Sequence, residues 1–246
     1  MTSISVTAAA GRAKLVVAAG DFSPRTIRVD ENGAEVALVA TKALLLGGDH
    51  VRIDLTVGPG AWLDVLETTG TVAYNGDDVP SSWTVHARVA EGGRLHWRGE
   101  PLVVATGANV LRDTRIDLGA GAVACLRETL VLGRSGERGG ALRNRTRIRL
   151  AGEPVLVEDL DLTGERELPG LVGQARVIDT VTLIGVRPVV PDLPVGQYFE
   201  LAGCGSVARQ LLTEAHRSGL DGVYRLWSHS GNGRAGSATG LLHRSH

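Results

Sequence analysis

Long stretches of the chain alternate apolar and polar residues with the period of two that is typical of β-strands. In HVRIDLTV, residues 50–57, every second residue from Val51 onward is apolar. RTRIRL at 145–150 and PVLVEDLDL at 154–162 show the same alternation, although Glu158 interrupts the apolar face of the second segment. The pattern predicts strands that bury one face and expose the other.

Three segments repeat a glycine turn followed by an alternating strand: VGPGAWLDVLET at 57–68, VAEGGRLHWRGE at 89–100 and LGAGAVACLRET at 118–129. Their starts are 32 and 29 residues apart (89−57=32; 118−89=29), and a looser copy begins at Val29. A period near 30 indicates stacked β units that bury their faces on one another. The 33 glycines among 246 residues, nearly twice the usual share of about 7%, indicate many tight turns. We predict an all-β fold with helically stacked, β-helix-like strands, or otherwise a sandwich-like arrangement.

Helix signals are confined to the C-terminal part of the chain. In GSVARQLLTEAHRSG, residues 205–219, Ser206 can cap a helix and Gly219 can end it. The next stretch, GLDGVYRLWSH at 219–229, is compatible with a second short helix or with a strand. We expect one or two C-terminal helices within a single β domain over residues 1–228. A flexible Gly/Ser/His tail is expected over residues 229–246.

Charge and cysteine content exclude several classes of function. The 26 basic and 27 acidic residues give a formal charge of −1, which provides no field to attract nucleic acid or an anionic membrane. Cys125 and Cys204 lie far apart in apolar stretches, which favours burial over a disulfide or a metal site. The chain starts without the features of a signal peptide and lacks a run of about 18 apolar residues. We expect a cytoplasmic protein.

The common catalytic motifs are missing. The sequence has no P-loop, no H-E-x-x-H and no C-x-x-C. GNGRAG at 231–236 matches G-x-G-x-x-G, but no βαβ unit can follow it so close to the end of this sequence. GRSGE at 133–137 is not a nucleophile elbow. A Ser/His/Asp site stays open because its members meet only in space, yet we predict that the chain is not an enzyme.

One long stretch resembles a known family. ALLLGGDHVRIDLTVGPGAWLDVLETTGTVAYNG, residues 43–76, is similar to the N-terminal signature of the urease accessory protein family UreD, also called UreH. LHWRGEPLVVATGANV at 95–110 and RETLVLGRSGERGG at 127–140 resemble two further blocks of that family. The order and spacing hold over roughly residues 14–225. The chain departs from the pattern at Gly70, where the family usually has glutamine.

The resemblance implies a non-enzymatic scaffold in nickel urease maturation. Family members bind the urease apoprotein on one side and UreF on the other, with the GTPase UreG docked on UreF, in a complex with two-fold symmetry. No cofactor is expected to be tightly bound. Ni²⁺ is expected to pass transiently through a water-filled passage to the urease active site, and GTP is bound by the partner. The missing P-loop and the missing metal cluster agree with this division of roles.

The acids that interrupt core-facing patterns are candidates for a nickel path. A buried carboxylate costs free energy unless it is paired, hydrated or metal-bound. Ni²⁺ accepts carboxylate ligands, and single carboxylates along a path bind an ion weakly enough to release it. The candidates are Asp49, Glu67, Glu128 and Glu158. The alternative for each is a turn or edge carboxylate near solvent or an arginine. His50 is a weaker candidate because neighbouring strand residues face opposite ways.

Other residues of the resembling stretches are expected to serve structure or partner contact. They are Gly47 and Gly48 in a turn, Thr68, Thr69 and Tyr74 packing or lining the passage, and Arg134 and Glu137. Two alternative functions remain. A β-solenoid carbohydrate-binding or hydrolytic domain would need exposed aromatics or paired carboxylates, and only 4% of the residues are aromatic. A purely structural partner without a metal path would tolerate alanine at Asp49 and Glu128.

Overall fold

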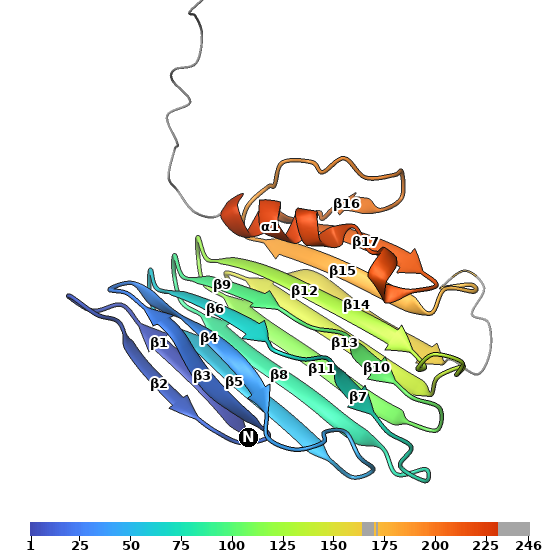
Figure 1. Ribbon diagram of the computed structural model, residues 1–246. Coiled ribbons are helices and arrows are strands. Elements are labelled where there is room, and N and C mark those ends of the chain that lie inside the picture. Colours follow the sequence, from blue (N-terminus) through green and yellow to red (C-terminus); the bar gives the residue numbers. More distant parts are fainter. Residues whose placement is uncertain (164–169, 171, 231–246) are drawn as a thin grey trace, which may run out of the picture.

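The computed structural model describes residues 1–163, 170 and 172–230, and these form two β-sheets that pack face to face (Figure 1). The seven-stranded sheet consists, in spatial order, of β14 (Glu153–Thr163), β13 (Ala141–Leu150), β11 (Asn109–Leu118), β8 (Ser81–Val89), β5 (His50–Val57), β1 (Thr2–Thr7) and β2 (Lys14–Ala18). The ten-stranded sheet consists of β16 (Tyr198–Glu200), β17 (Gly205–Leu212), β15 (Val177–Ile184), β12 (Val123–Leu132), β9 (Arg94–Arg98), β6 (Trp62–Glu67), β4 (Gly33–Ala40) and β3 (Phe22–Val29), with β10 (Leu102–Val104) between β12 and β7 (Thr71–Ala73).

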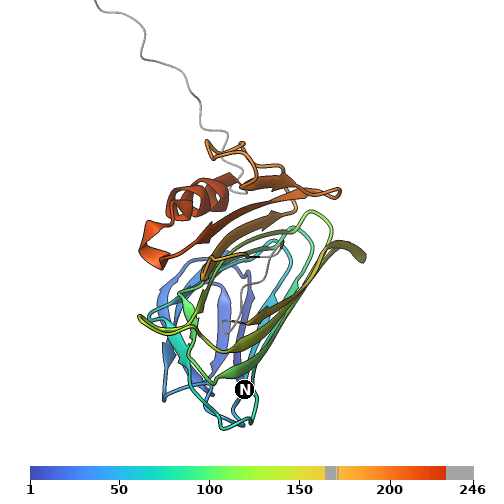
Figure 2. The ribbon, with the colours of Figure 1, turned by 90° about the vertical axis from the view of Figure 1, so that its right-hand side faces the viewer.

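The central strands run parallel because the chain winds from one sheet to the other and back. Strands β5, β8, β11 and β13 pair in parallel in the seven-stranded sheet, and β4, β6, β9 and β12 do so in the ten-stranded sheet. A parallel pair needs a crossover connection, and here each crossover contains a strand of the opposite sheet. Figure 2 shows this winding from the end of the stack. The predicted stack of similar β units is therefore confirmed.

The three sequence repeats are the turns by which the chain crosses between the sheets. Each copy starts at the last residue of β5, β8 or β11 and continues into β6, β9 or β12. Antiparallel pairs occur toward the ends of the stack, at β1 with β2, β3 with β4, β13 with β14, and through β12, β15, β17 and β16. The main core fills the space between the sheets, where alternate residues such as Ile53 and Leu55 are buried.

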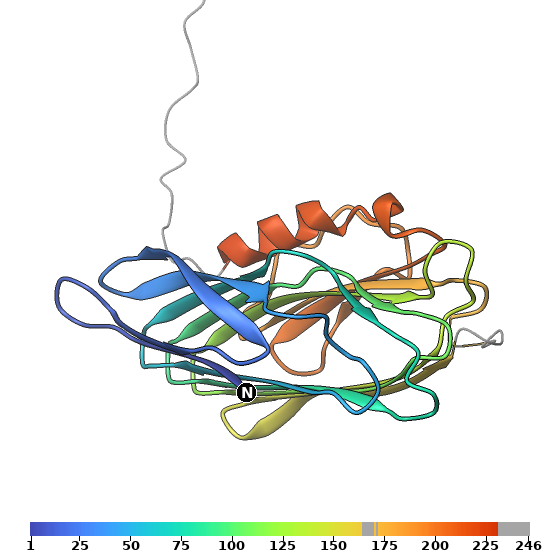
Figure 3. The same cartoon turned by 60° about the horizontal axis from the view of Figure 1, so that its bottom comes forward.

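The helix lies on the outer face of the ten-stranded sheet. It is α1 (Leu220–Ser230), and it covers the side facing away from the seven-stranded sheet (Figure 3). Leu220, Val223 and Trp227 recur at helical spacing and are buried in a second, smaller core with Cys125 and Val181. Among the described helices, none is long and apolar enough to cross a membrane.

The prediction of a helix over residues 205–219 is wrong. Residues 205–212 form β17, which pairs with both β15 and β16, and only Ala215–Arg217 forms a short 3₁₀ helix. Pairing with a neighbouring strand outweighs weak local helix preference. The helix is instead in the segment left open between helix and strand, and Ser218 accepts a hydrogen bond from the Leu220 backbone N–H at 3.1 Å.

The end of α1 and the two cysteines bear on two further predictions. Helix α1 runs to Ser230, two residues past residue 228, where the predicted domain ends, and residues 231–246 lie outside the described residues. Both cysteines are free; Cys125 is buried as predicted, whereas Cys204 is exposed. Cys204 lies in the turn between β16 and β17, where the backbone meets solvent.

Candidate functional site

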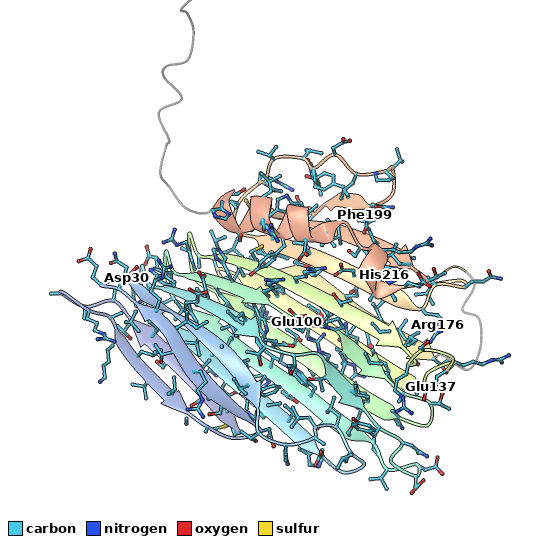
Figure 4. The ribbon with its side chains drawn as sticks, in the orientation of Figure 1. Asp30, Glu100, Glu137, Arg176, Phe199 and His216 are labelled. Carbon is cyan, nitrogen blue, oxygen red and sulfur yellow. The ribbon has the colours of Figure 1, made fainter. Side chains whose placement is uncertain are left out.

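A cavity lies between the two sheets, at a level where their inward faces become polar. The cavity has a volume of about 70 Å³, which is enough for several water molecules. Its charged lining residues are Glu67, Glu100, Glu128, Glu158, Arg112, Arg127 and Arg209. Trp83 and Trp97 contribute apolar wall, and Figure 4 shows Glu100 near the middle of the stack.

The repeat places polar residues at one level on neighbouring strands. Arg112 of β11 is the register partner of Trp83 on β8 and of Asn144 on β13. These residues are 29 and 32 positions apart (112−83=29; 144−112=32), as the repeat copies are. In the ten-stranded sheet, Glu128 is in register with Thr180, and Thr180 with Arg209. When neighbouring strands each carry one polar residue at the same level of their inward faces, these residues form a polar row across the sheet.

Glu128 is bound from the opposite sheet. Its Oε2 accepts a hydrogen bond from Asn144 Nδ2 at 2.9 Å, and its Oε1 forms an ion pair with Arg112. Glu128 shares the inward face of β12 with Ala124 and Leu126, so the predicted strand face is correct. Its side chain is 23% exposed, which leaves room for water or a small ion beside it.

Glu67 sits deeper, at the end of β6. Its Oε1 accepts a hydrogen bond from Trp97 Nε1 at 3.0 Å, and its Oε2 accepts one from the Glu100 backbone N–H at 3.2 Å. Burial raises the pKa of Glu67 to about 7, against the lowering influence of Arg112 and of the two hydrogen bonds. Burial likewise lowers the pKa of Arg112 to about 10. Glu67 is therefore poised to exchange a proton near neutral pH.

A glycine leaves space between these two acids. Glu67, Gly99 and Glu128 occupy the same position of the three repeat copies (67−57=10; 99−89=10; 128−118=10). A Cβ atom on Gly99 would lie 2.6 Å from the Arg127 carbonyl oxygen, so the close approach of the two strands requires glycine there. The cavity extends along this position because the middle copy carries no side chain.

Glu158 links the two sheets at the edge of the stack. Its carboxylate receives two hydrogen bonds from Arg209, from Nη1 to Oε1 at 2.7 Å and from Nη2 to Oε2 at 2.8 Å. Arg209 Nε also donates to Thr180 Oγ1 at 3.0 Å. Glu158 belongs to β14 and Arg209 to β17, which lie in different sheets. The ion pair between Glu158 and Arg209 therefore links the two sheets through side chains.

Several polar atoms around the cavity have no hydrogen-bond partner among the described residues. They are Trp83 Nε1, Arg112 Nε, Thr114 Oγ1 and Asn144 Oδ1. Trp83, Arg112 and Thr114 line the cavity directly. Buried polar groups without a protein partner are commonly satisfied by ordered water. These atoms give the cavity polar groups that ordered water can bind.

Asp49 lies outside this cavity. Its Oδ2 accepts a hydrogen bond from the Leu46 backbone N–H at 3.1 Å, and its own N–H donates to the Leu46 carbonyl at 2.9 Å. Gly48 holds the φ of +82° that the turn needs, and a Cβ on Gly47 would lie 2.8 Å from the Gly76 Cα. Asp49 and the two glycines therefore build a turn. His50 faces outward and pairs with Ser82, so it does not share a site with the cavity acids.

The other predicted structural residues also lie away from the cavity. Thr68 is tied to β4 by a hydrogen bond from its Oγ1 to the Leu38 carbonyl at 3.1 Å, and Thr69 and Tyr74 are exposed. Arg134 and Glu137 pair in an exposed loop, with Nε and Oε1 2.8 Å apart. Hydrogen bonds from Arg134 and its backbone lower the pKa of Glu137 to about 2. Figure 4 shows Glu137 near Arg176 at one end of the strands.

Sequence reasoning missed the arginines of the cavity. Arg112 and Arg209 lie in strands with apolar residues on the same face, and that interruption of the apolar pattern is the sequence signal for a buried arginine. In β11 the inward positions include Val110, Arg112 and Ile116, so Arg112 interrupts a buried face as Glu128 does in β12. Searching that pattern for buried bases as well as buried acids would have found it.

The charged groups of the cavity, among the described residues, are not arranged as a metal cluster. Among the described residues, no three His, Cys, Asp or Glu side chains are grouped so that they could hold a metal ion. The carboxylates stand singly, and Glu128 and Glu158 are balanced by arginine.

The fold and the cavity define a class of protein: a β-solenoid-like stack of two sheets with a charged cavity between them. Residues 8–235 match the family model described as UreD urease accessory protein. The chain is 47% identical over 196 residues to urease accessory protein UreD 1 of Streptomyces griseus, covering 79% of this chain and 76% of that protein. It is 36% identical over 181 residues to UreD of Streptomyces avermitilis, covering 72% and 71%. With UreD 1 of Saccharopolyspora erythraea the identity is 37% over 190 residues, covering 74% and 73%. The chain belongs to the UreD family of urease accessory proteins.

Proposed function

We propose that this chain is a non-enzymatic scaffold of urease maturation that passes Ni²⁺ to the urease apoprotein. In this proposal it binds apo-urease and UreF, with UreG and its GTP docked on UreF, in a cytoplasmic complex with two-fold symmetry. The observation that carries the proposal is the charged cavity between the sheets, to which three of the four predicted path acids contribute. Ni²⁺ is the transient cargo.

The form of the cavity supports transit rather than storage. Glu67, Glu128 and Glu158 each offer one carboxylate, and the unpartnered polar atoms nearby favour water around a moving ion. An ion that keeps part of its hydration shell and meets one carboxylate at a time binds weakly at each step. Asp49 has no part in this path because its carboxylate closes a turn elsewhere.

The alternative of a carbohydrate-binding or hydrolytic β-solenoid has less support. Such a domain would present its carboxylates and aromatic rings in a groove accessible to a polymer. Here Glu67 is buried, and Trp83 and Trp97 are buried between the sheets. Membership of an accessory-protein family also favours a supporting role over a catalytic one.

The basic test is co-expression of the urease structural and accessory genes with and without this chain. Nickel content per urease and urease activity are measured after purification. We expect both to fall strongly without the chain. Normal nickel content without it would refute the proposal.

The path itself is tested with Glu128→Gln. Glutamine keeps the size and an oxygen that can accept from Asn144 Nδ2, but it removes the negative charge that attracts a cation. We expect several-fold lower nickel loading while the complex elutes normally from a sizing column. Asp159→Asn is the matched control, because Asp159 pairs with Arg143 on an exposed surface. Normal loading by Glu128→Gln would favour a purely structural partner.

A further inference from the structure

Arg209 occupies both oxygens of the Glu158 carboxylate. Both oxygens of Glu158 accept a hydrogen bond from Arg209, at 2.7 and 2.8 Å. A two-pronged arginine–carboxylate contact leaves little capacity for another ligand, and the guanidinium charge repels a cation nearby. While this pair is closed, Glu158 cannot bind a divalent cation well.

Arg209 is the most exposed of the three arginines that line the cavity. Its side chain is 24% exposed, compared with 13% for Arg112 and 13% for Arg127. The Arg112 guanidinium lies 5.9 Å from the centre of the Trp83 ring, and Arg127 is held by Asp179 and Asp221. The backbone of Arg209 is fixed by a 2.8 Å hydrogen bond from its N–H to the Gln197 carbonyl. To leave Glu158, the side chain only has to give up its two bonds to Glu158 and the 3.0 Å hydrogen bond from Nε to Thr180 Oγ1, while the strand stays in place.

We propose that Arg209 is an exchangeable counter-ion that keeps Glu158 from trapping the metal. This inference rests on the nickel path proposed above. A passing divalent cation binds Glu158 by displacing the Arg209 guanidinium, and the guanidinium returns when the cation moves on. Because arginine competes for the same two oxygens, the site stays weak, and release needs no other ligand.

The test compares Ni²⁺ binding by the purified full-length chain and its variants in equilibrium dialysis. Arg209→Met keeps much of the apolar stem but removes the competing charge. We expect it to bind Ni²⁺ roughly tenfold more tightly or better, since removing a nearby charge changes affinity by at least about that factor. In the co-expression assay, more nickel should stay with this chain and less should reach urease.

Control variants test whether the loss of any arginine–carboxylate pair would raise Ni²⁺ affinity. Arg143→Met breaks a two-pronged pair with Asp159, at 2.9 and 3.0 Å, on the exposed surface, where Arg145 still donates to Asp159 at 3.0 Å, and should leave binding unchanged. The double variant Arg209→Met/Glu158→Gln should return to the affinity of the natural chain. Histidines at 229, 243 and 246 contribute the same background to every variant.

Unchanged Ni²⁺ affinity in Arg209→Met would overturn the counter-ion role. If urease still acquired nickel through the natural chain and lost it with Glu128→Gln, the path would stand without this device. Normal loading with Glu128→Gln and Glu158→Gln would instead refute the path. Arg209→Lys gives a second measurement if the methionine variant folds poorly. Lysine keeps the charge but cannot hold both oxygens, so its affinity should be intermediate; an affinity no higher than that of the natural chain would also overturn the inference.

Discussion

Glu67 should make the stability of the folded chain depend on pH in the neutral and mildly acidic range. Burial raises the pKa of its carboxyl from 4.5 to about 7 in the folded state. Between these values the unfolded chain has lost the proton and the folded chain still holds it, so folding takes up a proton. The contribution of Glu67 is full below pH 4.5 and falls as the pH rises to about 7. A difference of 2.5 units (7−4.5=2.5) corresponds to a loss of about 3 kcal/mol.

Urea unfolding at several pH values from about 5 to 8 measures this effect, with Glu67→Gln as the reference that cannot ionise. The free energy of unfolding of the natural chain, minus that of the variant, should decrease by about 2–3 kcal/mol across this range. Glu137→Gln is the control, because the pKa of Glu137 is about 2 and lies outside the range. A difference that does not vary with pH would refute the reasoning.

Four further substitutions test the turn and the helix. Gly48→Ala should lower the free energy of unfolding in urea by about 1–2 kcal/mol, because residue 48 has a φ of +82°. Gly222→Ala, inside α1 with open space around it, is the control and should be neutral or stabilising. Equal effects of the two substitutions would contradict the turn assignment. Asp49→Ala should lower stability by about 1 kcal/mol through the lost hydrogen bond to Leu46 and leave nickel loading unchanged, and lost loading at normal stability would restore Asp49 to the path. Trp227→Ala should cost about 3–5 kcal/mol and speed hydrogen exchange in α1, since the ring is fully buried; a cost near zero would mean that α1 is not firmly docked.

The sequence by itself determined the strands, the stacking and the family. Alternation is a local property of the chain, so HVRIDLTV could be assigned to a strand from its own residues. The repeat of about 30 residues predicted the stack because each copy has the same turn and the same inward face. Glu67, Glu128 and Glu158 were recognisable as acids that interrupt those faces, and the motif order over residues 43–140 identified the family.

Only the tertiary structure decided what those acids bind and which of them meet. Asn144 reaches Glu128 from 16 residues away, and Arg209 reaches Glu158 from 51 residues away, because strand order and register bring them together. Asp49, the candidate that follows the Gly-Gly pair of the family signature, closes its own turn with a local hydrogen bond. Residues 205–212 carry helix signals, yet pairing with β15 and β16 makes them a strand. The alternation within one strand does not show which residues of distant strands meet across the two sheets, and these contacts decided how the side chains that line the cavity pair with one another.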